Sequence, residues 1–169
     1  MHYLLSPKTT SRVFSRYFRG LIAALIATTL LTGCSYTREK LDLDTTAKLF
    51  FKIAEDVNPD ASGRPSPVVV NLLFLRNNRQ FEQEDLISLM ENAEDRLGKD
   101  LINKIRLKEF IPGETRNEFF ELTAETAYIG VVTEYVQYQN AEAKLLLKLE
   151  PHTNNKFGVH VNRLSMSEK

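Results

Sequence analysis

The sequence predicts a mainly β protein, an antiparallel β-sandwich with one added helical excursion. From Ala47 onward, apolar and polar side chains alternate in short runs, a pattern typical of β-strands. Segments rich in Pro, Gly, Asn and Asp separate these runs and indicate turns. Residues 84–97 differ, because their apolar side chains recur every three or four positions, as on one face of a helix.

The first 33 residues have the order of a secretory signal peptide. Four basic and no acidic residues precede a largely apolar run from Leu21 to Leu31, and small residues follow. This run is far shorter than the roughly 20 residues that span a bilayer. Leu31-Thr32-Gly33-Cys34 matches a bacterial lipobox, so we expect cleavage before Cys34 and lipid on its sulfur. The alternative is an ordinary cleavage site beside a free or buried cysteine.

Lipidation at Cys34 predicts a membrane location for the mature protein. One acyl chain binds a membrane only marginally, whereas two or more bind it firmly. Ser35 stands where an Asp would favour retention in the inner membrane, so we expect the periplasmic face of a Gram-negative outer membrane. The polar residues 34–46 are expected to form a tether, and residues 47–169 the folded domain.

The first two expected strands flank a long loop. Residues 48–54 place Leu49, Phe51 and Ile53 on one face. Residues 67–75 are apolar on both faces, which predicts a central strand that is covered on both sides. Residues 55–66 between them are dense in Asn, Pro, Asp and Gly and are expected to form a surface loop.

A helix and five further strands are expected after residue 83. The helix over 84–97 begins among acidic side chains, which its dipole favours, and Gly98 is placed to end it. The later strands are expected at 100–110, 116–122, 127–135, 144–149 and 156–164, with a turn at 111–113. The total of about seven short strands is typical of a sandwich.

Composition argues against several functions. Four of the 22 basic residues lie in the first 33 positions, so 18 basic and 22 acidic residues remain, and this net charge of −4 disfavours nucleic acid. A single cysteine excludes an intramolecular disulfide. Neither His152 nor His160 has a second potential ligand at metal-binding spacing in the sequence, and catalytic motifs are missing, so we expect no enzyme, metal or cofactor.

Several segments resemble the TssJ family, the outer-membrane lipoproteins of type VI secretion systems. They are Asn58-Pro59-Asp60, Gly63-Arg64-Pro65-Ser66-Pro67, Phe81 before the acidic helix start, Pro112-Gly113, and Ala127-Tyr128-Ile129-Gly130-Val131-Val132. The resemblance implies a transthyretin-like sandwich. It also implies binding to the periplasmic C-terminal domain of TssM, an inner-membrane protein that forms an envelope-spanning complex with TssL.

In that family the TssM contact is attributed to the loop between the first two strands. The resemblance therefore implies these partner-binding residues: Glu55, Asp56, Val57, Asn58, Pro59, Asp60, Ala61, Ser62, Gly63 and Arg64. We expect Val57 and Pro59 to supply an apolar anchor and the charged side chains to set encounter rate and register. Three alternatives stay open: a loop that is only a solvated connector, an envelope carrier with a small ligand between its sheets, and an envelope hydrolase.

Overall fold

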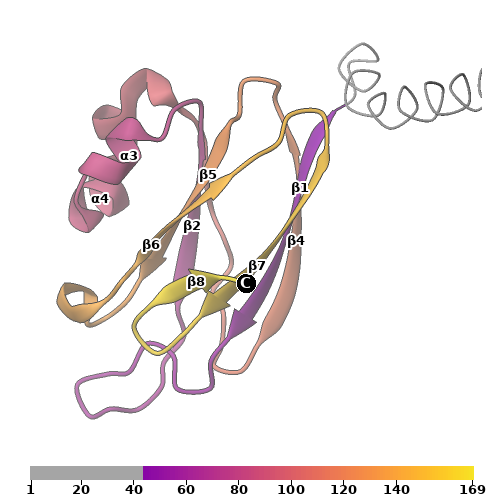
Figure 1. Ribbon diagram of the computed structural model, residues 1–169. Coiled ribbons are helices and arrows are strands. Elements are labelled where there is room, and N and C mark those ends of the chain that lie inside the picture. The colour runs from indigo at the N-terminus through magenta and orange to yellow at the C-terminus, as the bar shows by residue number, and fades with distance from the viewer. Residues whose placement is uncertain (1–43) are drawn as a thin grey trace, which may run out of the picture. The chain divides into compact units, whose positions relative to one another are not determined.

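The structure, a computed structural model, describes residues 44–169, which form two four-stranded sheets that pack into a sandwich (Figure 1). The first sheet has the order β4-β1-β7-β8, with β4 at Thr115–Leu122, β1 at Thr45–Ile53, β7 at Asn154–Val161 and β8 at Met166–Glu168. The second has the order β3-β2-β5-β6, with β3 at Leu101–Arg106, β2 at Val69–Leu75, β5 at Tyr128–Glu134 and β6 at Lys144–Lys148. The expected sandwich is confirmed.

One strand pairing differs from the antiparallel expectation. β1 pairs with β7 in parallel, with Lys48 opposite Lys156 and Phe50 opposite Gly158. The other pairings of named strands are antiparallel. β6 runs opposite to β5 and ends at the end of the sandwich where β1 starts. The chain crosses there to the first sheet, so β7 runs in the same direction as β1.

The helical excursion contains two helices instead of one. The helix α3 spans Arg79–Gln83 and α4 spans Leu86–Leu97. The break lies at Asp85, whose carboxylate accepts a hydrogen bond from the Ser88 backbone N–H at 3.0 Å and so caps α4. Gly98, at a φ of 49°, ends α4 as expected, and the short 3-10 helix η1, Gly98–Asp100, leads into β3.

Other elements begin or end at residues that differ from the expected ones. Thr45 already belongs to β1 and is buried, so the folded domain begins two residues earlier than the expected start at residue 47. β3 ends at Arg106, and Phe110 forms an isolated bridge with Val68. The strand β8 was not expected. A second 3-10 helix, η2, covers Tyr138–Asn140 between β5 and β6.

The mostly apolar strand β2 is buried on both faces, as its sequence predicted. One face, with Val70, Leu72 and Phe74, belongs to the core between the sheets. The other face, with Leu73 and Leu75, belongs to a second core beneath the helices. That second core consists of Leu73, Leu75, Phe81, Leu89, Ala93, Leu97 and Val132. The helices therefore cover the second sheet, and Figure 1 shows them beside β2 and β5.

Connections at the two ends of the sandwich have different character. The end at which β1 starts carries the helical excursion and the β4–β5 and β6–β7 turns, whereas the opposite end carries four loops (Figure 1). These four are residues 54–68, 107–114, 135–143 and 162–165. The expected signal peptide, Cys34 and most of the tether lie outside the described residues. Among residues 44–169, none of the helices has the length and apolarity to cross a membrane.

Candidate partner-binding loop

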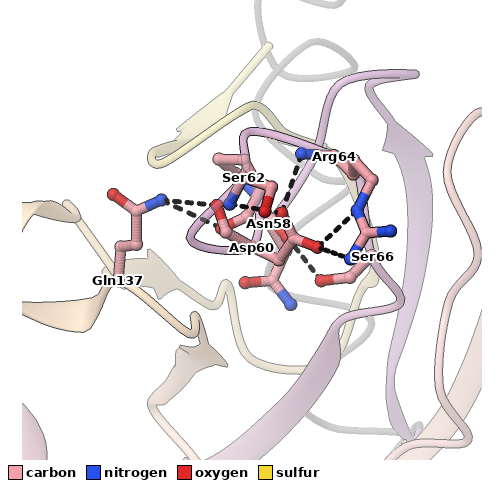
Figure 2. Close-up of polar contacts among 7 residues, drawn as sticks. Asn58, Asp60, Ser62, Arg64, Ser66 and Gln137 are labelled. Carbon is pink, nitrogen blue, oxygen red and sulfur yellow. Dashed lines mark hydrogen bonds and ion pairs between the residues drawn. The ribbon is translucent and has the colours of Figure 1, made fainter.

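The loop between β1 and β2, residues 54–68, has a defined conformation held by its own polar side chains. Asp60 accepts hydrogen bonds from the backbone N–H groups of Ser62 and Arg64 at 2.8 and 3.0 Å. Its second carboxylate oxygen pairs with the Arg64 guanidinium at 2.8 Å. Gly63, at a φ of 79°, donates its N–H to the Asp60 carbonyl at 2.9 Å. Figure 2 shows the contacts of Asp60 with Ser62 and Arg64.

The electrostatics of Asp60 follow from these contacts. The hydrogen bond from the Arg64 backbone lowers the pKa of the Asp60 carboxyl. Partial burial opposes this, while the Arg64 side chain and the Ser62 N–H lower the pKa further. Asp60 is therefore a carboxylate at neutral pH, and its charge interacts with Arg64 and backbone N–H groups of the same loop.

Asn58 joins the loop to its neighbours. It is buried and adopts a left-handed conformation with a φ of 48°, which Asn tolerates better than most residues. Its side-chain nitrogen donates to the Pro67 carbonyl at 2.6 Å, and its side-chain oxygen accepts from the Val136 N–H at 2.7 Å. Its backbone N–H donates to the Arg163 carbonyl at 3.0 Å. Asn58 thus connects three of the four loops at this end.

Gln137 supplies a second connection. Its side-chain amide donates to the Pro59 carbonyl at 3.0 Å and to the Asp60 carbonyl at 3.3 Å (Figure 2). The loop between β5 and β6 therefore holds the loop between β1 and β2 from the side. A loop held in this way loses little conformational freedom when a partner binds.

The ten expected partner-binding residues are not equally available. Val57 is completely buried in the core between the sheets, and Pro59 and Asn58 are also buried. The expectation that Val57 and Pro59 form an apolar anchor for a partner is therefore wrong, because both side chains pack inside this domain. The residues exposed to solvent are Glu55, Asp56, Ala61, Ser62, Gly63 and Arg64.

Exposed apolar side chains occur on the neighbouring loops instead. Ile111 and Val136 are each 60% exposed and Tyr138 is 38% exposed. Val136 and Tyr138 flank Gln137, and residues 136–140 line a surface hollow of about 340 Å³. Sequence reasoning missed these residues. The available signal was an apolar and an aromatic residue within a short segment that follows a strand and lacks strand alternation.

The histidines and carboxylates of the described part of the chain are the candidate ligands for a metal site. In residues 44–169 no group of three or more His, Cys, Asp or Glu side chains is arranged to bind a metal ion. His160 lies in β7, and His152 lies in the turn before it, where its backbone N–H donates to the Thr45 hydroxyl at 2.9 Å.

Two solved structures related to a type VI secretion lipoprotein share this fold. The crystal structure of the T6SS lipoprotein TssJ1 from Pseudomonas aeruginosa superposes with a TM-score of 0.71 at 23% identity, covering 75% of this chain and 95% of that one. A chain of a type VI membrane complex superposes with a TM-score of 0.63 at 25% identity, covering 73% and 96%.

A third similar chain comes from a structure described as the T6SS protein TssM C-terminal domain (869-1107) from EAEC. It superposes with a TM-score of 0.61 at 24% identity, covering 74% of this chain and 98% of that one. Comparison with curated protein sequences gives no match.

The family model named T6SS-SciN matches residues 45–164, which is more than half of the chain. Its description is type VI secretion lipoprotein, VasD, EvfM, TssJ. These are structural lipoproteins and not enzymes, which confirms the expectation of a non-catalytic protein. The chain therefore belongs to the TssJ family of type VI secretion lipoproteins.

Proposed function

We propose that this chain anchors a type VI secretion membrane complex to the outer membrane. In this proposal, lipid on Cys34 attaches the protein to the periplasmic face, and the loop end of the sandwich binds the periplasmic C-terminal domain of TssM. TssL belongs to the same complex through TssM. Membership of the TssJ family is the starting point of the proposal, and the geometry of the loop supports a contact there.

The observation that carries the proposal is the loop at residues 54–68. Its buried residues, Val57 and Asn58, fix its shape, whereas its tip at Ala61–Arg64 is exposed. Loops that are held on a rigid scaffold can bind a partner without disturbing the core. Exposed Val136 and Tyr138 beside the loop supply the apolar contact area that buried Val57 and Pro59 do not.

The similar chain in the EAEC TssM structure gives further support. The match covers 98% of that chain but only 74% of this one, so that chain is shorter than ours. It is too short to be the domain of residues 869–1107 that the structure is named for. This favours a chain with our fold that accompanies TssM in the same structure.

The contact is tested by placing a bulky charge on the loop tip. Ala61 is exposed and lies between the residues that hold the loop, so Ala61→Arg adds an obstacle while the hydrogen bonds remain. We expect this variant to bind the TssM domain at least about tenfold more weakly in a titration with both purified partners, a loss of about 1.4 kcal/mol.

A matched control uses the opposite end of the sandwich. Ala124 is exposed in the β4–β5 turn, so Ala124→Arg makes the same chemical change far from the loop. We expect wild-type affinity for this variant, and equal unfolding midpoints for both. If Ala61→Arg bound TssM as tightly as Ala124→Arg, the loop would not be the contact.

The lipid anchor is tested separately. Radiolabelled palmitate should be incorporated by the wild-type protein in cells, and Cys34→Ser should incorporate none and leave the outer-membrane fraction. Retention of the first 33 residues in the mature protein would contradict cleavage at the lipobox.

The structure supports a small-ligand carrier less well than it supports a partner-binding lipoprotein. The hollow at the edge between the two sheets, lined by Phe74, Ile105 and Phe120 among others, has a volume of about 90 Å³. Ligand pockets measure roughly 300–1,000 Å³. The space between the sheets is instead filled by the core side chains.

A further inference from the structure

The outward face of the first sheet carries exposed aromatic and basic side chains. The helices cover the second sheet, but among the described residues no helix packs on the outward face of β4-β1-β7. Phe119 is 62% exposed and Phe50 is 41% exposed on this face. Lys48, Lys52 and Lys156 are also exposed. We call these five residues the basic aromatic face.

Strand register places these residues in adjacent rows. Phe119, Lys48 and Lys156 lie opposite one another across β4, β1 and β7. In the next row Phe50 lies opposite Gly158, which has no side chain. A shallow hollow of about 320 Å³ forms there, with both lysines of the first row in its lining. The face thus combines an apolar floor with ammonium groups at the margin.

The lysines of this face are not engaged in ion pairs among the described residues. Among the described residues, no carboxylate lies within ion-pair distance of Lys48, Lys52 or Lys156. Glu121 is the acidic side chain on the outward positions of β4, one row beyond Phe119. Like charges on directly opposite strand positions, such as Lys48 and Lys156, destabilise a sheet. An anionic surface would relieve this repulsion.

We propose that the basic aromatic face binds the surface of a membrane that contains anionic phospholipid. Lysines attract the phosphate groups, and exposed phenylalanine rings enter the boundary between head groups and acyl chains. Lys48 is the fourth residue of β1, so the face begins at the end where the chain leaves the proposed lipid anchor. The inference rests on the proposed lipid anchor in one respect only: the anchor would keep the domain close to the membrane. Nine residues, 35–43, separate Cys34 from the first described residue.

Membrane contact through the basic aromatic face is compatible with partner binding at the loop. The basic aromatic face is a side of the sandwich, whereas the loop at residues 54–68 lies at its end. Contact of the sheet with a membrane would leave the loop accessible. The domain would then be oriented at the membrane surface instead of rotating freely on its tether.

The magnitude follows from the number of lysines. Each lysine near an anionic surface contributes about 1 kcal/mol, which is about a fivefold change in partitioning. Lys48→Ala combined with Lys156→Ala should therefore weaken vesicle binding roughly 25-fold. Binding should also weaken as sodium chloride rises from about 50 to about 500 mM, because salt screens exposed charges.

The test uses the mature chain with Cys34→Ser, so that an acyl chain does not contribute. Cosedimentation is measured with vesicles of phosphatidylcholine alone and with vesicles that contain about 30% phosphatidylglycerol, a fraction that gives a strongly negative surface. We expect binding to the second kind only. The matched control is Lys99→Ala with Lys108→Ala, which removes two exposed lysines outside the face and should bind like the parent.

Three results would overturn the proposal. The first is equal binding of the parent to both kinds of vesicle, and the second is no binding to either. The third is equal vesicle binding by the two double variants. Loss of TssM binding by the Lys48 and Lys156 variant, with vesicle binding intact, would assign the face to a protein partner instead. Failure of the proposed TssM contact would leave vesicle binding unchanged, so the two proposals fail separately.

Discussion

Replacing Asn58 by alanine tests how the loop at residues 54–68 is held. The side chain of Asn58 makes two hydrogen bonds, to the Pro67 carbonyl and from the Val136 N–H. It is 3% exposed, so water cannot easily replace the lost side chain. Alanine would leave both backbone groups without this partner, and it would place a Cβ at a φ of 48° without the local hydrogen bonds that favour Asn there.

These effects give the expected magnitude. Each lost hydrogen bond costs about 1 kcal/mol, and more where the remaining group stays buried. The left-handed conformation costs a residue with a Cβ about 1 kcal/mol. We therefore expect Asn58→Ala to lower the free energy of unfolding by about 3 kcal/mol and Asn58→Gly by about 2 kcal/mol, because glycine removes the side chain without the conformational cost.

The assay is urea unfolding followed by far-ultraviolet circular dichroism, because the chain contains no tryptophan for fluorescence. Asn117→Ala is the control, since Asn117 is exposed in β4, and it should change the free energy of unfolding by less than about 0.5 kcal/mol. Equal stability of the alanine and glycine variants would refute the conformational part. A loss below about 0.5 kcal/mol in both would refute the role of the side chain.

Three further predictions concern packing, a buried hydroxyl and pH. Gly130→Ala should lower the free energy of unfolding by about 1–3 kcal/mol in urea, because its Cβ would lie 2.5 Å from the Phe81 ring, and adding Phe81→Leu should recover part of the loss. Tyr135→Phe should lower the free energy of unfolding by about 1–2 kcal/mol by calorimetry, because the buried hydroxyl donates its one proton to the Ser165 carbonyl at 2.8 Å, with the Asn162 carbonyl 3.1 Å away. The lowered pKa of Asp60 means that its stabilising contribution is present above the ordinary value of 3.8 and is lost as the pH falls below it. The stability difference between wild type and Asp60→Asn should therefore shrink in acid unfolding curves, and a difference that grew in acid would contradict this sign.

The sequence was most informative about which faces of an individual strand are buried. Alternation in β1 predicted one buried face, and the apolar side chains on both faces of β2 predicted cover on both sides. Both follow from side-chain chemistry and a period of two. The parallel pairing of β1 with β7 could not be predicted in this way, because alternation does not record which strand lies alongside or in which direction.

The sequence predicted where the loop lies in the chain, but not which of its side chains are exposed. Turn residues located the loop, and Asn58 and Gly63 adopt the left-handed conformations that such residues tolerate. Val57 and Pro59 seemed available because their neighbours in sequence are polar. Val57 instead packs in the core between the sheets, and the loop is held by residues far along the chain, such as Gln137, which donates to the Pro59 carbonyl. Contacts of this kind have no local signature.

In the proposed function the two ends of the sandwich have separate tasks, and β1 spans the distance between them. Its nine residues extend about 30 Å at roughly 3.3 Å per residue, from the start of the described domain to the start of the loop. The strand is paired on both sides, with β4 and β7, so it is a stiff connection. Tension between a membrane anchor at one end and a partner at the other would act along β1. It would then load the rows of hydrogen bonds to β4 and β7 in shear, so that many bonds share the load. The loop itself is held by Asn58, Asp60 and Gln137, so little binding energy is needed to order it.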